Sequence, residues 1–419
     1  MTSFIGIIRG SNWFVAYVVL LSLLAANCEP SRRDEKLTGI NHSSGEEFAG
    51  SETCVQCHKS ITESFAETPH FQTSSFGSPA TIKGSLDSGE NILQLTERLK
   101  VFLEEREGKV FQRASIDGKD VDIKPVDIAM GSGRQGQTYL FWKGDSLFQL
   151  PASYHAATDS WSNSPGYPSD RIVFDRSISA RCLECHATNF KVTKSVGEVE
   201  TFDPATVMLG VDCERCHGPA ARHVNFHRGN PNGHDGKFIV NPQSLEKKRK
   251  IDNCALCHSG MRTNLMPSFS YTVGQDLDRF FVPMQSVDSG ASVDVHGNQV
   301  GLLKASKCFK LSEMDCSTCH DVHEKETKKL SVFSARCMNC HEEGSERFCK
   351  QPASSGIVLR DNCIDCHMPS LPSRKVFLQS PARTDPTPFF VRTHLISTYK
   401  KQIEAFIEDA AMKNSRADQ

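Results

Sequence analysis

The pattern CxxCH, in which two cysteines separated by two residues are followed at once by a histidine, occurs seven times in this 419-residue chain. The copies lie at Cys54–His58, Cys182–His186, Cys213–His217, Cys254–His258, Cys316–His320, Cys337–His341 and Cys363–His367. Random placement of 17 cysteines and 16 histidines would give far fewer than one copy, so the spacing is specified. Any fold of this chain must accommodate seven such sites.

Three chemistries use closely spaced cysteines. Zinc sites take four ligands and use CxxC units in pairs, which leaves an odd number of motifs and the constant histidine unexplained. A thioredoxin-like dithiol needs no adjacent histidine and normally occurs once or twice in a chain. Covalent haem c accounts for every position, because the two thiols attach to the porphyrin and the next residue places an imidazole beneath the iron. The motifs therefore predict seven covalently attached haems.

The predicted attachment residues are the two cysteines of each motif. They are Cys54, Cys57, Cys182, Cys185, Cys213, Cys216, Cys254, Cys257, Cys316, Cys319, Cys337, Cys340, Cys363 and Cys366. The predicted proximal iron ligands are the motif histidines, namely His58, His186, His217, His258, His320, His341 and His367.

Three cysteines lie outside the motifs, namely Cys28, Cys308 and Cys349. In an oxidising compartment, two left-over cysteines most simply form a structural disulfide, so a bridge between Cys308 and Cys349 is one expectation. The alternatives are two buried thiols, or one thiol that acts as an unusual iron ligand. The sequence leaves this choice open.

The N-terminus is typical of an exported protein. Residues 1–27 contain the apolar run Trp13–Asn27, which is short for a membrane span and fits the core of a signal peptide. The run ends at Cys28, and "LLAANC" resembles the lipobox of bacterial lipoproteins, although Asn27 departs from it. We expect export to the periplasm or outer membrane with a lipid on Cys28; an uncleaved anchor or cleavage elsewhere is the alternative. The polar residues 28–50 are expected to form a flexible tether.

The second axial ligand of each iron decides between electron transfer and catalysis, because an open position can bind substrate. Nine histidines lie outside the motifs. The favoured distal ligands are His70, His223, His227, His296, His323 and His394. His155 and His234 are weaker candidates, and His42 is expected to be solvated within the tether. His223 and His227 lie four residues apart, so one helical face could present both to two different haems.

The 123 residues between the first two motifs have a different pattern. "GKVFQRASIDGKDVDIKPVDIAM" and "QTYLFWKGDSLFQLPASY" predict strands, the second a hairpin that turns at Lys143-Gly144-Asp145. "GSGRQG", from Gly131 to Gly136, matches GxGxxG but precedes a strand, so we expect a loop and no nucleotide site. The basic run Glu246–Lys250 is expected to be solvated, or to contact a haem propionate or an acidic partner.

These patterns predict a mostly α fold with little regular structure and a β-rich insertion between the first and second motifs. The expected divisions are residues 1–27 (signal peptide), 28–50 (tether), 51–80 (first haem segment), 81–175 (β-rich insertion), 176–395 (multihaem domain with six motifs) and 396–419 (C-terminal helix and tail). The formal charge of -2 gives no indication of nucleic-acid binding.

The motif segments resemble the multihaem cytochromes c related to the tetrahaem electron acceptor of hydroxylamine oxidoreductase. "SETCVQCHKSITESFAETPH" is similar to that family's first haem segment, and "CERCHGPAARHV", "CALCHSG", "CSTCHDVH" and "NCIDCHMP" are similar to its later haem blocks. The resemblance implies a mostly helical body in which closely packed haems pass electrons in the bacterial envelope. Seven motifs and the strand-rich insertion are departures from the tetrahaem members.

Two functions follow from these features. The first is a heptahaem electron carrier, without catalytic residues, that exchanges electrons with redox proteins or other cytochromes. The second is an oxidoreductase of a small nitrogen or sulfur compound at one haem with an open coordination site. All seven motifs end in histidine, which favours the carrier, whereas a haem without a distal histidine would favour the enzyme. Redox partners, potentials and oligomeric state cannot be predicted from the sequence.

Overall fold

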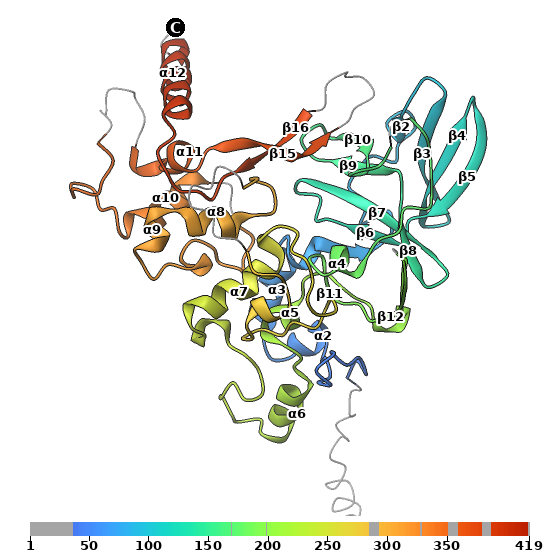
Figure 1. Ribbon diagram of the computed structural model, residues 1–419, viewed down its shortest axis with the longest axis horizontal. Coiled ribbons are helices and arrows are strands. Elements are labelled where there is room, and N and C mark those ends of the chain that lie inside the picture. The colour runs from blue at the N-terminus through green and yellow to red at the C-terminus, as the bar shows by residue number, and fades with distance from the viewer. Residues whose placement is uncertain are drawn as a thin grey trace, which may run out of the picture.

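The computed structural model describes residues 37–168, 170–197, 199–284, 293–326, 329–350, 359–378 and 387–417. A strand-rich part and a part built of short helices lie side by side (Figure 1). The α-helices are α2 (Ser51–Cys54), α3 (Lys59–Ala66), α4 (Ala180–Leu183), α5 (Cys213–His217), α6 (Ala221–Gly229), α7 (Lys247–His258), α8 (Gln299–Ala305), α9 (Lys307–Lys310), α10 (Leu330–Met338), α11 (Ile364–His367) and α12 (Lys400–Ala417). Short 3-10 helices are η1 (Phe71–Thr73), η2 (Pro204–Thr206), η3 (Pro242–Ser244), η4 (Leu277–Arg279), η5 (Cys316–Thr318) and η7 (Leu359–Asp361).

The strands form five sheets among the described residues. The strands are β1 (Ser74–Phe76), β2 (Ile92–Gln94), β3 (Leu99–Arg106), β4 (Lys109–Ile116), β5 (Lys119–Pro125), β6 (Ile128–Met130), β7 (Gly136–Lys143), β8 (Ser146–Gln149), β9 (Ala152–His155), β10 (Ser160–Asn163), β11 (Ala187–Asn189), β12 (Val192–Val196), β13 (Val199–Phe202), β14 (Met208–Leu209), β15 (Ser370–Leu378) and β16 (Thr387–Arg392). One sheet has the order β1-β6-β7-β9-β10, with β8 paired to β7. A second has the order β2-β3-β4-β5, and the pairs β11-β14, β12-β13 and β15-β16 complete the set.

The expectation of a mostly α fold is wrong. Helices make up 27% of the chain and strands 25%. The prediction overcounted helix because each motif needs only one helical turn, and α4 and α11 are four residues long. It also missed strands outside the insertion, among them β15 and β16, where proline and serine hide the alternation that marks a strand.

The segment between the first two motifs contains the largest cluster of buried apolar side chains in the described part of the chain. Strands β7 and β8 pair antiparallel with Lys143 opposite Ser146, which confirms the predicted hairpin and its turn at Gly144-Asp145. The stretch from Gly131 to Gly136 is a loop between β6 and β7, as expected. Gly131 has a φ of 110°, and a Cβ there would lie 2.5 Å from the carbonyl oxygen of Gly136, so this turn requires glycine.

One buried amide joins the two large sheets. The side chain of Gln112 on β4 is 0% exposed, donates a hydrogen bond to the carbonyl of Ala152 on β9 at 2.8 Å, and accepts one from the Ala152 N–H at 2.9 Å. The surrounding core includes Val101 and Leu103 of β3, both 0% exposed. Gln112 therefore satisfies both backbone groups of Ala152 where water has no access.

We predict that Gln112→Leu destabilises the strand-rich part by about 3 kcal/mol, because it leaves a buried N–H and a buried carbonyl of Ala152 without partners. Gln94 on β2 is exposed and donates only to a nearby carbonyl, so Gln94→Leu is the matched control. Chemical unfolding monitored by far-ultraviolet circular dichroism measures the difference. Equal midpoints for the two variants would show that the amide bridge contributes nothing.

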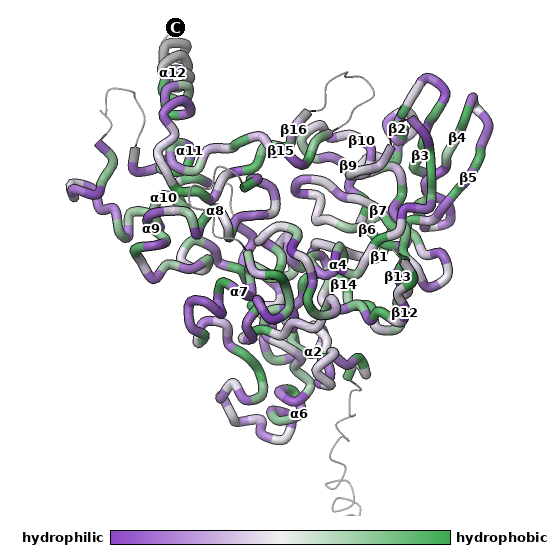
Figure 2. Tube along the Cα trace, viewed as in Figure 1, coloured by the Kyte–Doolittle hydropathy of each residue, from purple (hydrophilic) through white to green (hydrophobic). Residues whose placement is uncertain are grey.

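The part that carries the later motifs has few buried apolar side chains. A core cluster around α7 includes Ile251, Leu256 and Leu277. Beyond Leu302, only Ile364 and Ile403 are buried hydrophobic residues in the described part of the chain. Figure 2 shows hydrophobic stretches in the strand-rich part, whereas much of the helical part is hydrophilic. Ordinary side-chain packing alone does not fill this part of the molecule.

Residues 37–50 pack against the body of the protein, which differs from the expected flexible tether. His42 is 6% exposed and Phe48 is 2% exposed, so the expectation that His42 is solvated is wrong. The carboxylate of Glu214, inside the third motif, accepts hydrogen bonds from the backbone N–H groups of Ala49 and Gly50, both at 2.8 Å. The predicted lipobox cysteine and signal peptide lie outside the described residues.

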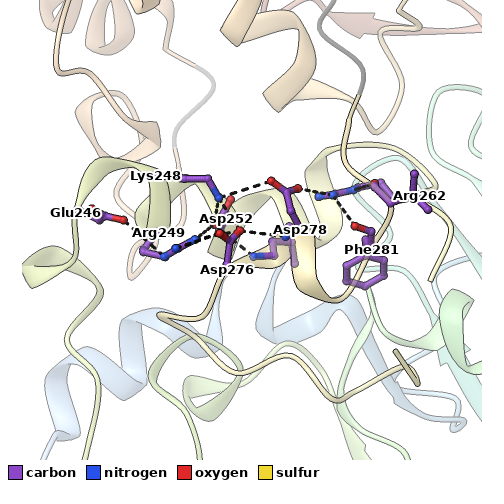
Figure 3. Close-up of polar contacts among 10 residues, drawn as sticks. Glu246, Lys248, Arg249, Asp252, Arg262, Asp276, Asp278 and Phe281 are labelled. Atoms are coloured by element: carbon purple, nitrogen blue, oxygen red, sulfur yellow. Dashed lines mark hydrogen bonds and ion pairs between the residues drawn. The ribbon is translucent and has the colours of Figure 1, made fainter. Parts of the chain in front are cut away.

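The basic run at the start of α7 is engaged within the molecule. Lys248 Nζ lies 2.6 Å from Asp276 and 3.2 Å from Asp252, and Arg249 Nη1 lies 2.9 Å from Asp252. Figure 3 shows this cluster, which also contains Glu246, Arg262, Asp278 and the carbonyl of Phe281. The run thus fixes the η4 loop to α7, whereas the sequence suggested a solvated basic surface. Among the described residues, no helix is long and apolar enough to cross a membrane.

Candidate functional site

Each CxxCH motif adopts about one helical turn. In the first and fifth motifs the backbone N–H of the histidine donates to the carbonyl of the first cysteine, from His58 to Cys54 at 2.8 Å and from His320 to Cys316 at 3.0 Å. In the second motif, His186 donates to the Leu183 carbonyl at 2.8 Å. Because an α-helix has 3.6 residues per turn, the two cysteines lie on one face and the histidine follows beside them. The local sequence therefore folds into a unit that presents two sulfurs and one imidazole together.

The predicted attachment cysteines differ in how far they are exposed. Cys57, Cys182 and Cys340 are exposed, whereas the other motif cysteines are half-buried. Cys57 departs most clearly from an enclosed sulfur, because it follows α2 at the surface and its backbone N–H donates to the Cys54 carbonyl at 3.2 Å. A thioether bond at the edge of a porphyrin does not require a buried sulfur. Haem attachment at Cys57 therefore stays a prediction, made from its spacing to Cys54 and His58.

Hydrogen bonds orient six of the seven motif imidazoles through Nδ1. The partners are Thr73 Oγ1 for His186, the Val240 carbonyl for His217, Gln299 Oε1 for His258, Glu326 Oε1 for His320, the Arg347 carbonyl for His341 and the Ser397 carbonyl for His367. An imidazole that uses Nδ1 in this way keeps Nε2 for a metal ion. Sequence reasoning missed these partners, because they lie up to 113 residues from the histidine that they hold.

Four motif histidines each face a second histidine ring. The pairs and the distances between their ring centroids are His58–His223 at 6.4 Å, His258–His70 at 6.1 Å, His217–His323 at 6.1 Å and His320–His394 at 6.2 Å. Each second histidine is one that the sequence favoured as a distal ligand. In three pairs the ring planes are within 22° of parallel, whereas His258 and His70 are nearly perpendicular at 86°.

These separations fit a metal ion between the two rings. A bond from an imidazole nitrogen to a metal ion is about 2 Å long, so two such bonds, added to the distance from each nitrogen to its ring centre, give a separation close to the values found. Burial, together with nearby His258 and His320, lowers the pKa of His70 to about 4. Burial likewise lowers the pKa of His394 to about 4. Both imidazoles are therefore neutral near pH 7, which is the form that ligates metals.

Three motif histidines, His186, His341 and His367, have no such partner, although all sixteen histidines lie in the described part of the chain. The structure does not bring His227 or His296 opposite a motif histidine: His227 Nε2 is 2.9 Å from the Asp235 carbonyl oxygen, and the His296 ring lies beside Phe389. The weaker candidates also lie elsewhere. His155 is buried against Phe389, with Nδ1 near Thr158, and His234 is exposed.

The motifs follow one another in space through contacts between their cysteines. A hydrogen bond with Cys54 raises the pKa of Cys213, which joins the first and third motifs. The pKa of Cys254 is raised chiefly by a hydrogen bond with Cys316, then by burial, and also by nearby Cys216, so the fourth motif adjoins the fifth and the third.

Similar contacts connect the other motifs. A hydrogen bond with Cys257 lowers the pKa of Cys185 to about 7, which places the second motif beside the fourth. The pKa of Cys337 is raised chiefly by a hydrogen bond with Cys363, and to a smaller extent by Cys319. The spatial order is therefore first, third, fourth, fifth, sixth and seventh, with the second beside the fourth.

The remaining described cysteines do not form the expected bridge. Cys308 and Cys349 are both free thiols. Cys308 lies near Cys340 of the sixth motif, and Cys349 lies near Cys366 of the seventh. The structure therefore has no disulfide between these two cysteines. In the described part of the chain, no three His, Cys, Asp or Glu side chains converge as a metal site.

Comparisons with known proteins agree with this geometry. The family model for cytochrome c554 and c-prime matches residues 139–218, which include the second and third motifs. The multihaem cytochrome MtrA of Shewanella baltica (strain OS185) is 25% identical over 200 residues, which are 44% of this chain and 51% of that protein. The crystal structure of the outer cell wall cytochrome OcwA aligns with 85% of this chain and 81% of its own, at a TM-score of 0.51 and 17% identity. The chain is a multihaem cytochrome c.

This cytochrome accordingly binds haem c covalently. The CxxCH cysteines stay the predicted attachment residues. A haem needs space within the protein, which the sparse apolar packing beyond Leu302 leaves. It also needs imidazoles that can ligate its iron, which the histidine pairs would supply. The cytochrome spans about half the length of its curated relative. The narrower relation to the tetrahaem electron acceptor of hydroxylamine oxidoreductase stays a prediction.

Proposed function

We propose that this cytochrome is an electron-transfer protein with seven haems, one at each CxxCH motif. The observation that carries the proposal is the unbroken spatial series of motifs, in which neighbouring motifs are close enough for their cysteines to interact. Haem c supplies a reversible one-electron iron couple whose potential depends on its ligands and surroundings. The residues of the chain hold the sites in sequence, so one electron at a time can pass along them.

The proposed axial ligands follow from the ring pairs. His223, His70, His323 and His394 complete the sites of the first, fourth, third and fifth motifs. Two strong imidazole ligands close an iron to substrate, which suits transfer better than catalysis. His227 and His296 stay predictions for the second, sixth and seventh motifs, where a side chain would have to move to reach the metal.

We further propose that the cytochrome works in the cell envelope and exchanges electrons with other cytochromes or redox proteins. The signal-like residues 1–27 and the lipobox-like Cys28 support export with a lipid anchor. The similarity to an outer cell wall cytochrome supports the same compartment.

The mass of the intact mature protein tests the proposal. We expect the polypeptide mass plus seven haems, together with an absorption spectrum that changes reversibly with reduction. Alanine at both cysteines of one motif, for example Cys54 and Cys57, should lower the mass by one haem and so test attachment at the exposed Cys57. A colourless protein with the mass of the bare chain would contradict the proposal.

A second function is favoured by one observation. His186, His341 and His367 face no second histidine ring, so the sixth position at these sites is available to a small molecule. An oxidoreductase of a small nitrogen or sulfur compound is therefore the alternative. Electron paramagnetic resonance separates the two: a high-spin ferric signal that shifts with nitrite or hydroxylamine, with turnover of that compound, indicates the enzyme, and an unaffected signal indicates the carrier.

A further inference from the structure

The imidazole of His320 differs from the other motif imidazoles in its hydrogen-bond partner. Its Nδ1 lies 2.6 Å from the carboxylate oxygen Oε1 of Glu326. The other five partners that hold a motif Nδ1 are neutral oxygens, three of them backbone carbonyls. Of the seven motif histidines, all of which lie within the described ranges, only His320 is paired with a charged acceptor.

A carboxylate acts on a ligating imidazole in two ways. It accepts the Nδ1 proton strongly, which makes Nε2 a better electron donor to the metal, and its negative charge stabilises the more positive oxidation state. Both effects favour ferric over ferrous iron and so lower the potential. The effect persists only where the carboxylate is shielded from water, and the Glu326 side chain is 21% exposed.

We infer that Glu326 is a positioning residue that lowers the reduction potential at the fifth motif relative to a site with a neutral acceptor. The inference rests on the proposed function, because it requires a haem at Cys316–His320. The positive charge of Arg336 opposes the effect of the Glu326 carboxylate on the potential, but Glu326 still contacts His320. Arg336 Nη1 is 4.0 Å from Glu326 Oε1, and this guanidinium also donates to the Cys319 carbonyl.

The fifth motif lies inside the series of motifs, with neighbours on both sides. The fifth motif adjoins the fourth through Cys316 and the sixth through Cys319, so it lies between the first four motifs and the last two. A lowered potential there makes the fifth site the step at which an electron in transit is held least strongly. Glu326 thereby favours electrons that reside on the sites before the fifth motif or on the sites after it, and not on the fifth site itself.

The chain contains a natural comparison for the test. At the fourth motif, the neutral side-chain oxygen of Gln299 lies 3.2 Å from Nδ1 of His258. Glu326→Gln therefore gives the fifth site the partner that the fourth site already has, and it keeps an acceptor that can orient the ring. Glu324→Gln, two residues away, removes the same charge from an exposed side chain and is the matched control.

The experiment is a spectroelectrochemical titration of the holoprotein and the two variants. Glu326→Gln should raise one of the seven one-electron transitions by weakening the preference for the ferric state roughly tenfold, equivalent to about 59 mV. Glu324→Gln should leave all transitions in place. Equal titrations for the two variants would overturn the inference.

Two further measurements keep the inference separate from the proposed function. The reciprocal change Gln299→Glu should lower one transition, and it carries the test if Glu326→Gln does not accumulate; no downward shift would then overturn the inference. The intact mass of each protein reports haem attachment. A deficit in the unmodified protein would contradict the seven-haem function, whereas full haem content with unmoved transitions would contradict only the role of Glu326.

Discussion

Alanine in place of His223 is expected to convert one of the seven ferric sites from low spin to high spin, while alanine in place of His227 leaves every site unchanged. The two histidines lie four residues apart on α6, and their rings are 4.6 Å apart, so the substitutions perturb the same helix. Only His223 faces a motif histidine, with its ring centroid 6.4 Å from that of His58. Its Nδ1 is 2.8 Å from the Lys237 carbonyl oxygen, which leaves Nε2 directed at the metal position.

Low-temperature electron paramagnetic resonance measures this effect directly. A new high-spin ferric signal in His223→Ala, equal in intensity to one site, is the expected result, because loss of one axial imidazole weakens the ligand field. Imidazole added to the buffer should restore the low-spin signal by occupying the vacated position. If His227→Ala gives the high-spin signal instead, the ligand assignment at the first motif is wrong.

The largest loss of electron transfer between sites is expected when the fourth motif is removed by alanine at both Cys254 and Cys257. This motif adjoins the second, third and fifth motifs, so its loss separates the second site and the fifth, sixth and seventh sites from the first and third. Reduction of the protein adsorbed on an electrode should change from one phase to a fast and a slow part. The slow part should account for four of the six sites that remain when the protein is attached through the first-motif end.

The matched control removes the cysteines of the seventh motif, Cys363 and Cys366. That motif is at the end of the series, so the variant also loses one haem but keeps the others connected. Intact mass must show six haems in both variants, and circular dichroism must show equal secondary structure. If the fourth-motif variant is reduced in a single phase under those conditions, electron transfer between the sites does not require this series of motifs.

The cofactor-binding residues stay predictions, and they can be proposed from the sequence because haem attachment has a local signature. Two thiols and an imidazole must fall within one helical turn, so the spacing alone names them, and it names Cys57 although that thiol is exposed. The candidate distal ligands His70, His223, His323 and His394 can be predicted from the sequence only as a group, since a ligand donated across space leaves no fixed spacing to its partner. The structure pairs them with particular motifs through the fold.

Other features could not be predicted because their determinants are distant in sequence. Nothing local to Glu326 or Gln299 indicates that each will hold a motif imidazole. The predicted fold class was wrong for a related reason. We expected full helices where the motifs form only short helical turns. Strands such as β15, with Pro372 opposite Phe390, lack the usual alternation of apolar and polar residues. Burial of His42 was also unpredictable, since a polar segment of that composition is usually solvated.

The docking of residues 37–50 onto Glu214 sets a limit on how far the cytochrome can stand from a surface. Leu37 follows the proposed anchor at Cys28 by nine positions, and a fully extended chain of that length spans about 30 Å. A lipid on Cys28 would therefore hold the molecule close to its membrane through a connection beside the first and third motifs. One terminus of the redox series would then face the lipid headgroups, and the seventh motif would point toward partners farther away.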